Sequence, residues 1–164
     1  MKTGLEFLEQ EVYLPGYMTI RKFDYSKKSG LFEFNLIDFN VSHISEINYL
    51  TPRGLHLCIS QSTYLLGEEL LKEGEYGLDL EDLRKIILEG RVKIVELNQK
   101  FRKEVKLKEK LQGKLDLTNL REGKMPLFMF DFDFGNHSIY GNLVTLISPK
   151  PLPQTNVDLS RLRD

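Results

Sequence analysis

The sequence predicts an α+β domain in which a long antiparallel sheet wraps around one central helix. The first observation is an apolar segment between Thr51 and Gly74 with the length and the end signals of a single long helix. The second is that the segments after it alternate apolar and polar residues, which is typical of strands with one face in water. With 164 residues and 41% hydrophobic content, the chain can bury one core. We expect one domain over residues 1–148 and a proline-rich, flexible tail over 149–164.

The central helix is predicted to be buried on most of its sides. Thr51 can serve as its N-cap, Pro52 suits the first helical position, and Gly74 can end it in a left-handed conformation. Its apolar residues cover too many faces for a surface helix; they are Leu55, Leu57, Cys58, Ile59, Leu65, Leu66, Leu70 and Leu71. The single cysteine, Cys58, is therefore interpreted as a small buried hydrophobe and not as a nucleophile.

Several segments carry a strand pattern. Alternation over 31–35 and, less regularly, over 91–97 indicates two strands, and residues 101–117 are predicted to form one long strand with an apolar and a lysine-rich face. The segments 128–134 and 139–147 flank a Gly135-Asn136 turn and predict a hairpin.

Two shorter helices complete the expected elements. Residues 79–90 predict an amphipathic helix that Asp79 caps and Gly90 ends. A shorter helix is expected around Leu5, Phe7, Leu8 and Val12.

Composition limits the classes of partner. A formal net charge of −1 gives no electrostatic reason to expect nucleic acid or an anionic membrane. Residues 1–12 carry three glutamates and no apolar core, so we expect no signal peptide and a cytoplasmic protein. We expect no membrane span, and three scattered histidines predict no metal site. No cofactor is expected.

Two short motifs resemble a known family. Residues 53–64, Arg-Gly-Leu-His-Leu-Cys-Ile-Ser-Gln-Ser-Thr-Tyr, resemble the central helix of the β-hydroxyacyl-carrier-protein dehydratases, which have the hotdog fold, with Gln61 at the place of their helix glutamine. Residues 100–105, Lys-Phe-Arg-Lys-Glu-Val, are similar to a segment at the start of one of their core strands. His43 precedes Gln61 by the separation expected of their catalytic histidine. The resemblance implies a hotdog fold, and the exposed sheet edge of a single hotdog predicts a two-fold dimer joined near residues 91–97.

Departures from that family weaken the case for dehydration. Leu57 stands four residues before Gln61, where the dehydratases carry a carboxylate, and the proline-glycine element after their histidine is missing here. The chain also resembles FcoT-like acyl-CoA thioesterases, which use a histidine and a neutral Asn-Gln pair on the helix. Ser60-Gln61 takes the place of that pair, and Ser45 stands where a second asparagine is expected.

These resemblances and the chemistry of thioester hydrolysis define the candidate site. His43 is the candidate base near neutral pH, and a helix N-terminus can stabilise the developing oxyanion. The expected catalytic residues are His43, Ser60 and Gln61, and the expected substrate-binding residues are Ser45, Arg53, Gly54 and Tyr64.

Three functions stay open from the sequence. The first is an acyl-thioester hydrolase that acts on acyl-CoA or on acyl-carrier protein, and the second is a 3-hydroxyacyl-thioester dehydratase. The third is a non-catalytic hotdog protein that binds acyl groups or mediates assembly. The lysine-rich face of residues 106–114 is interpreted as a solvated strand face, or as an attractor for a CoA phosphate or an acidic carrier protein.

Overall fold

The computed structural model describes residues 2–13, 17–36, 49–106 and 110–148. The elements in chain order are α1 (Gly4–Phe7), the π-helix η1 (Leu8–Val12), β1 (Ile20–Ser26), β2 (Ser29–Phe34), α2 (Pro52–Lys72), α3 (Leu80–Leu88), β3 (Val92–Phe101), β4 (Leu111–Arg121), β5 (Leu127–Phe134) and β6 (Ile139–Ile147).

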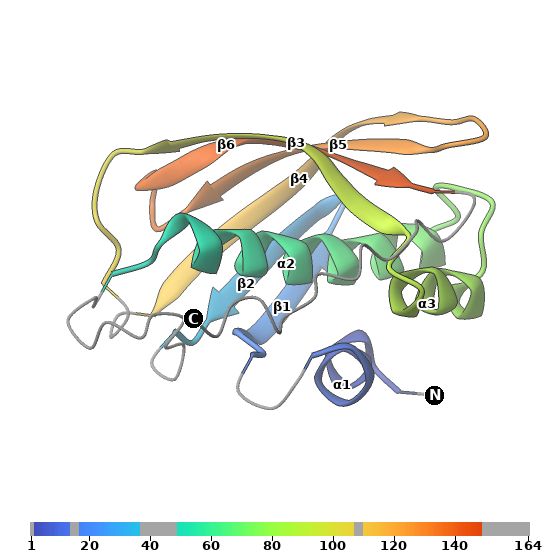
Figure 1. Ribbon diagram of the computed structural model, residues 1–164, viewed down its shortest axis with the longest axis horizontal. Coiled ribbons are helices and arrows are strands. Elements are labelled where there is room, and N and C mark those ends of the chain that lie inside the picture. The colour runs from blue at the N-terminus through green and yellow to red at the C-terminus, as the bar shows by residue number, and fades with distance from the viewer. Residues whose placement is uncertain (1, 14–16, 37–48, 107–109, 149–164) are drawn as a thin grey trace, which may run out of the picture.

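The six strands form one antiparallel sheet in the order β1-β2-β4-β5-β6-β3, so β1 and β3 are its edges. The sheet curves over α2, which runs along its concave side, while α1 and α3 lie near the C-terminal half of α2 (Figure 1). This arrangement confirms the α+β prediction of a sheet around one central helix.

Helix α2 begins and ends where the sequence predicts. The Thr51 hydroxyl accepts a hydrogen bond from the backbone N–H of Gly54, and Gly74 has a φ of 75° just beyond the C-cap. Ile59 and Cys58 are fully buried. Burial raises the pKa of the Cys58 thiol to about 12, so the thiol stays protonated near neutral pH and is a poor nucleophile.

Phenylalanine rings from the sheet fill the space over α2. Phe34 stands 5.2 Å from Phe134 between ring centroids and 6.0 Å from Phe32. At Gly113 an added Cβ would lie 2.3 Å from the Phe134 ring, so the absence of a side chain there lets the ring lie flat against the sheet.

The predicted strand over 101–117 is wrong. Strand β3 ends at Phe101, and β4 begins only at Leu111. Because β5 and β6 lie between β3 and β4 in the sheet, the chain has to cross from one position to the other and cannot continue as one strand. Val105 is buried in this connection, and its carbonyl accepts a hydrogen bond from the Leu50 N–H at 2.7 Å. Because Val105 is apolar and buried outside a strand, it contributes to an alternation that looks like that of a strand.

Strand β1 is absent from the sequence prediction, and β3 is irregular. β1 is an edge strand on which only Ile20 is fully buried, so it gives little alternation. In β3 the register with β6 shifts between Ile94 and Glu96, and Val95 is left 52% exposed. This β-bulge explains the imperfect alternation over 91–97.

The other predicted elements are confirmed: α3, the β5–β6 hairpin and an N-terminal helix. Residues 149–164 lie outside the described residues.

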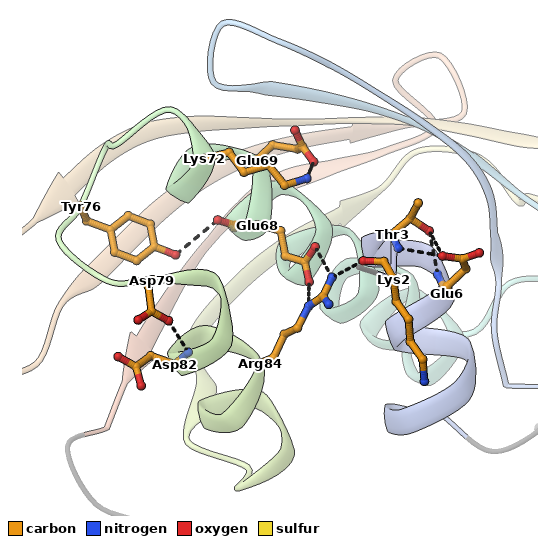
Figure 2. A network of polar contacts seen from close by, with 11 residues as sticks. Lys2, Thr3, Glu6, Glu68, Glu69, Lys72, Tyr76, Asp79, Asp82 and Arg84 are labelled. Carbon is orange, nitrogen blue, oxygen red and sulfur yellow. Dashed lines mark hydrogen bonds and ion pairs between the residues drawn. The ribbon is translucent and has the colours of Figure 1, made fainter.

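A buried ion pair joins the helices (Figure 2). Arg84 of α3 donates from Nε to Glu68 Oε1 at 2.8 Å and from Nη2 to Glu68 Oε2 at 3.2 Å. Its Nη2 also donates to the Lys2 carbonyl at 2.9 Å, and its guanidinium lies 4.8 Å from the centroid of the Phe7 ring. Glu68 is 2% exposed, and the fork of Arg84 supplies the partners that a buried carboxylate requires.

Replacing Ile59 with alanine tests the buried helix. We expect Ile59→Ala to lower the free energy of unfolding by about 2–5 kcal/mol, because a fully packed side chain is lost and a cavity remains. Leu88→Ala is the matched control, since Leu88 is 56% exposed and should change stability by no more than about 0.5 kcal/mol. Denaturant melts measure both; equal losses in the two variants would contradict the burial of Ile59.

The free edge of β3 leads us to expect a two-fold dimer in which this strand extends the sheet across the axis. Val95 and Phe101 are exposed on this strand. Val95→Lys should weaken the dimer, whereas Leu31→Lys, at an exposed position on β2, should not. Sedimentation that finds the wild type monomeric at micromolar concentration would rule this assembly out.

Candidate active site

An open groove runs between the N-terminal half of α2 and the inner face of β3. The residues that line it are Tyr13, Tyr17, Pro52, Arg53, His56, Leu57, Ser60, Tyr64, Leu97 and Gln99. The helix contributes Arg53, His56, Ser60 and Tyr64 at spacings of three and four residues, which place them on one face. Three of the predicted site residues, Arg53, Ser60 and Tyr64, therefore meet in one groove.

The first turn of α2 leaves one backbone donor free at this groove. Pro52 has no N–H, and the N–H groups of Gly54 and Leu55 donate to Thr51 Oγ1 at 3.2 Å and to the Thr51 carbonyl at 2.9 Å. Among the described residues, the Arg53 N–H has no acceptor. A free N–H at a helix N-terminus can stabilise negative charge on an oxygen atom.

Ser60 and Tyr64 present polar groups farther along α2, in the same groove. The Ser60 hydroxyl donates to the His56 carbonyl at 2.9 Å, which leaves its oxygen lone pairs as acceptors. Burial raises the pKa of the Tyr64 phenol above its ordinary value, so Tyr64 remains a neutral hydroxyl. His56, exposed on the same face, is an imidazole in the groove.

Gln99 faces the same groove from β3. Its Oε1 is the one buried side-chain nitrogen or oxygen atom without a hydrogen-bond partner in the part of the chain that the structure describes. Leaving such an acceptor unsatisfied costs about 1–3 kcal/mol, and an orphaned buried group calls for an explanation. The bulge at Val95 brings Leu97 and Gln99 to the inner side of β3, together with Val92 and Ile94 before it.

Gln61 is oriented differently from Ser60 and Tyr64. Its Oε1 accepts hydrogen bonds from the Thr19 N–H at 2.9 Å, the Thr19 hydroxyl at 2.7 Å and the Ile20 N–H at 3.3 Å. Its Nε2 donates to the Tyr17 carbonyl at 2.8 Å. The side chain is fully buried and is not among the groove's lining residues, so in this arrangement it ties α2 to the start of β1.

Two predicted residues, His43 and Ser45, lie outside the described residues. Gly54 is buried, and its N–H is occupied by the Thr51 cap, so it lies beside the groove but is not one of its lining residues.

The sequence reading missed several groove residues. His56 is not among the predicted site residues, although its spacing from Arg53 and Ser60 places it on their helix face. Tyr13, Tyr17, Leu97 and Gln99 come from segments far from α2 in the chain, and no local pattern marks them.

The groove as described has no acidic lining residue and no cluster of metal ligands. None of its lining residues is an aspartate or glutamate. Within residues 2–13, 17–36, 49–106 and 110–148, no group of three or more His, Cys, Asp or Glu residues could hold a metal ion. No helix in those ranges is both long and apolar enough to cross a bilayer.

Solved structures of other proteins share this fold. A candidate thioesterase from Shewanella oneidensis has 7% sequence identity and a TM-score of 0.55, covering 81% of this chain and 85% of its own. An uncharacterised protein from Pyrococcus horikoshii has 14% identity and a TM-score of 0.53, covering 87% and 94%. A dehydratase heterocomplex from Xenorhabdus doucetiae has 9% identity and a TM-score of 0.50, covering 93% of both chains.

The fold is thus the hotdog fold that the sequence motifs predicted. At these identities the likeness extends to the fold alone. No family model matches the chain, and no curated protein matches it.

The role of Gln61 can be tested by replacing it with methionine, which has a similar length and no amide. Gln61→Met would leave buried partners on β1 without hydrogen bonds, at about 1–3 kcal/mol for each group. We therefore expect a marked loss of unfolding free energy. Ser60→Ala is the neighbouring control and should change stability little. A Gln61→Met protein as stable as the wild type, with lower turnover, would instead favour a catalytic role.

Proposed function

We propose that this protein hydrolyses acyl thioesters of CoA or of acyl-carrier protein in the groove between α2 and β3. The observation that carries the proposal is that one groove along a buried helix holds neutral polar groups, an imidazole and, at the N-terminal end, a backbone N–H that has no acceptor among the described residues. This set matches the needs of thioester hydrolysis, which are an oxyanion donor, a base and groups that orient water.

The reaction would proceed by attack of water on the thioester carbon. The carbonyl oxygen would accept a hydrogen bond from the Arg53 N–H, which strengthens as negative charge develops. The Ser60 hydroxyl would orient the attacking water, and Tyr64 would contact the substrate farther along α2. A histidine would remove the proton of the attacking water, and the tetrahedral intermediate would break its C–S bond to release a carboxylic acid and a thiol.

Two histidines are candidates for the base. His43 is favoured by the resemblance to the dehydratases and thioesterases, and it lies outside the described residues. His56 lines the groove directly. The Arg53 side chain is exposed at the same end of the groove, where its charge suits a phosphate of CoA or of a carrier protein.

Dehydration has less support. Leu57 lines the groove at the place where the dehydratases carry their carboxylate, and the lining offers no acid to protonate a departing hydroxyl. Acyl binding without turnover requires only the groove, so it is the outcome that the kinetic test must separate from hydrolysis.

The proposal is tested with acyl-CoA thioesters of increasing chain length and detection of the released thiol. Should His43 be the base, His43→Ala should lower turnover by roughly 10²–10⁴-fold and leave the thermal melt unchanged. His56→Ala is the matched comparison, because it removes the other histidine. Ser60→Ala should lower turnover less than loss of the base, since solvent can partly replace an orienting hydroxyl.

The pattern of losses assigns the base. A large loss in His56→Ala alone would move the role of base from His43 to His56. Equal, slow hydrolysis by the wild type and both histidine variants would overturn catalysis, and acyl binding without turnover would then be the better account.

A further inference from the structure

A second, smaller cavity lies deeper in the fold, between α2, α3 and strands β3, β5 and β6. Its lining residues are mostly apolar; they include Leu83, Ile87, Val92, Phe128, Phe130 and Ile147. Its volume is about 30 Å³, enough for a water molecule by size. The mostly apolar wall favours contact with hydrocarbon.

Two polar side chains in the cavity wall, Thr63 and Tyr76, donate hydrogen bonds to the backbone of α2. Thr63 Oγ1 donates to the Ile59 carbonyl at 2.8 Å, and the Tyr76 hydroxyl donates to the Gly67 carbonyl at 3.3 Å. The O–H groups of both residues therefore already donate hydrogen bonds within the protein. The cavity is better suited to methylene groups than to a polar ligand.

Of the residues that the structure describes, Tyr64 alone lines both the open groove and this cavity. It stands one helical turn beyond Ser60, a rise of about 5.4–6 Å, which equals the length of only a few methylene groups. An acyl chain that starts beside Ser60 and runs along α2 would reach the Tyr64 ring before it reached the cavity.

We propose that Tyr64 closes the acyl end of the groove, so that the protein selects short acyl chains and leaves the cavity behind Tyr64 unfilled. This inference rests on the proposed function, because it takes the groove to be the acyl site. Removing the ring would join the groove to the cavity, and longer chains would then gain contacts. Each additional buried methylene should tighten binding about fourfold.

Gly67 offers an independent way to change the cavity. An added Cβ at Gly67 would find only the Tyr76 hydroxyl oxygen, at 4.0 Å, so Gly67→Ala would place a methyl group in the wall without a clash. Alanine also favours the helix over glycine. The variant therefore narrows the cavity and leaves the fold intact.

The test measures binding of non-hydrolysable acyl-CoA thioethers, from acetyl to palmitoyl, by calorimetry with the full chain. For the wild type we expect affinity to rise with chain length and then to stop at a short chain. In Tyr64→Ala the rise should continue to longer chains by about fourfold per methylene. Tyr64→Leu, which keeps an apolar side chain at this position, provides the same test if the alanine variant does not fold. Tyr64→Phe keeps the ring and should keep the wild-type limit.

Gly67→Ala completes the design. Added to the wild type, Gly67→Ala should leave the chain-length limit unchanged. Added to Tyr64→Ala, it should shorten the limit, because only the Tyr64→Ala protein admits the acyl chain to the cavity. An unchanged limit in folded Tyr64→Ala or Tyr64→Leu would overturn this inference and leave the proposed function standing. Absence of binding by the wild type to every analogue would overturn the proposed function itself, and the inference with it.

Discussion

The structure depends on burying a long helix that carries polar side chains among its apolar ones. A buried polar group has to find a hydrogen-bond partner inside the protein, or it destabilises the fold. Ser62 and Thr63 donate back to carbonyls of α2 itself, at 2.9 Å and 2.8 Å. Gln61 and Glu68 bind elements outside the helix, at the start of β1 and on α3. These two contacts explain why the N-terminal segment and α3 are held against α2 and not merely linked to it along the chain.

The same constraint divides α2 into a structural side and a side available for chemistry. Gln61 bonds Tyr17, Thr19 and Ile20, at and just before the start of β1, and it is not among the residues that line the groove. Ser60 and Tyr64 lie on the neighbouring side, beside the edge strand β3, and keep polar atoms in the groove. Gln61 thus makes a packing contact, whereas its neighbour Ser60 is a candidate site residue.

Local signals predicted the elements that local chemistry determines. Thr51, Pro52 and Gly74 defined the ends of α2, and the Gly135-Asn136 turn predicted the β5–β6 hairpin. Where the outcome depends on the whole sheet, the sequence reading failed. Apolar alternation over 101–117 could not reveal that two strands separate β3 from β4, and the edge strand β1 buries too little to show a pattern.

The helix side of the groove could be predicted from spacing alone. The inward direction of Gln99 could not be predicted in this way, because it depends on the bulge at Val95, between Ile94 and Glu96.

The groove is also where the described part of the chain leaves hydrogen-bonding capacity unused. The Arg53 N–H is a donor without an acceptor, and Gln99 Oε1 is a buried acceptor without a donor. Elsewhere on α2 the buried polar side chains have hydrogen-bond partners. The two atoms without partners therefore belong to the groove and do not reflect poor packing throughout the protein. Folded proteins tend to break such rules at functional sites. A ligand that brings a carbonyl oxygen and an N–H, as the thioester and amide groups of an acyl-pantetheine arm do, could satisfy both atoms. The two unsatisfied polar atoms and the chemistry proposed for the groove therefore point to the same class of ligand.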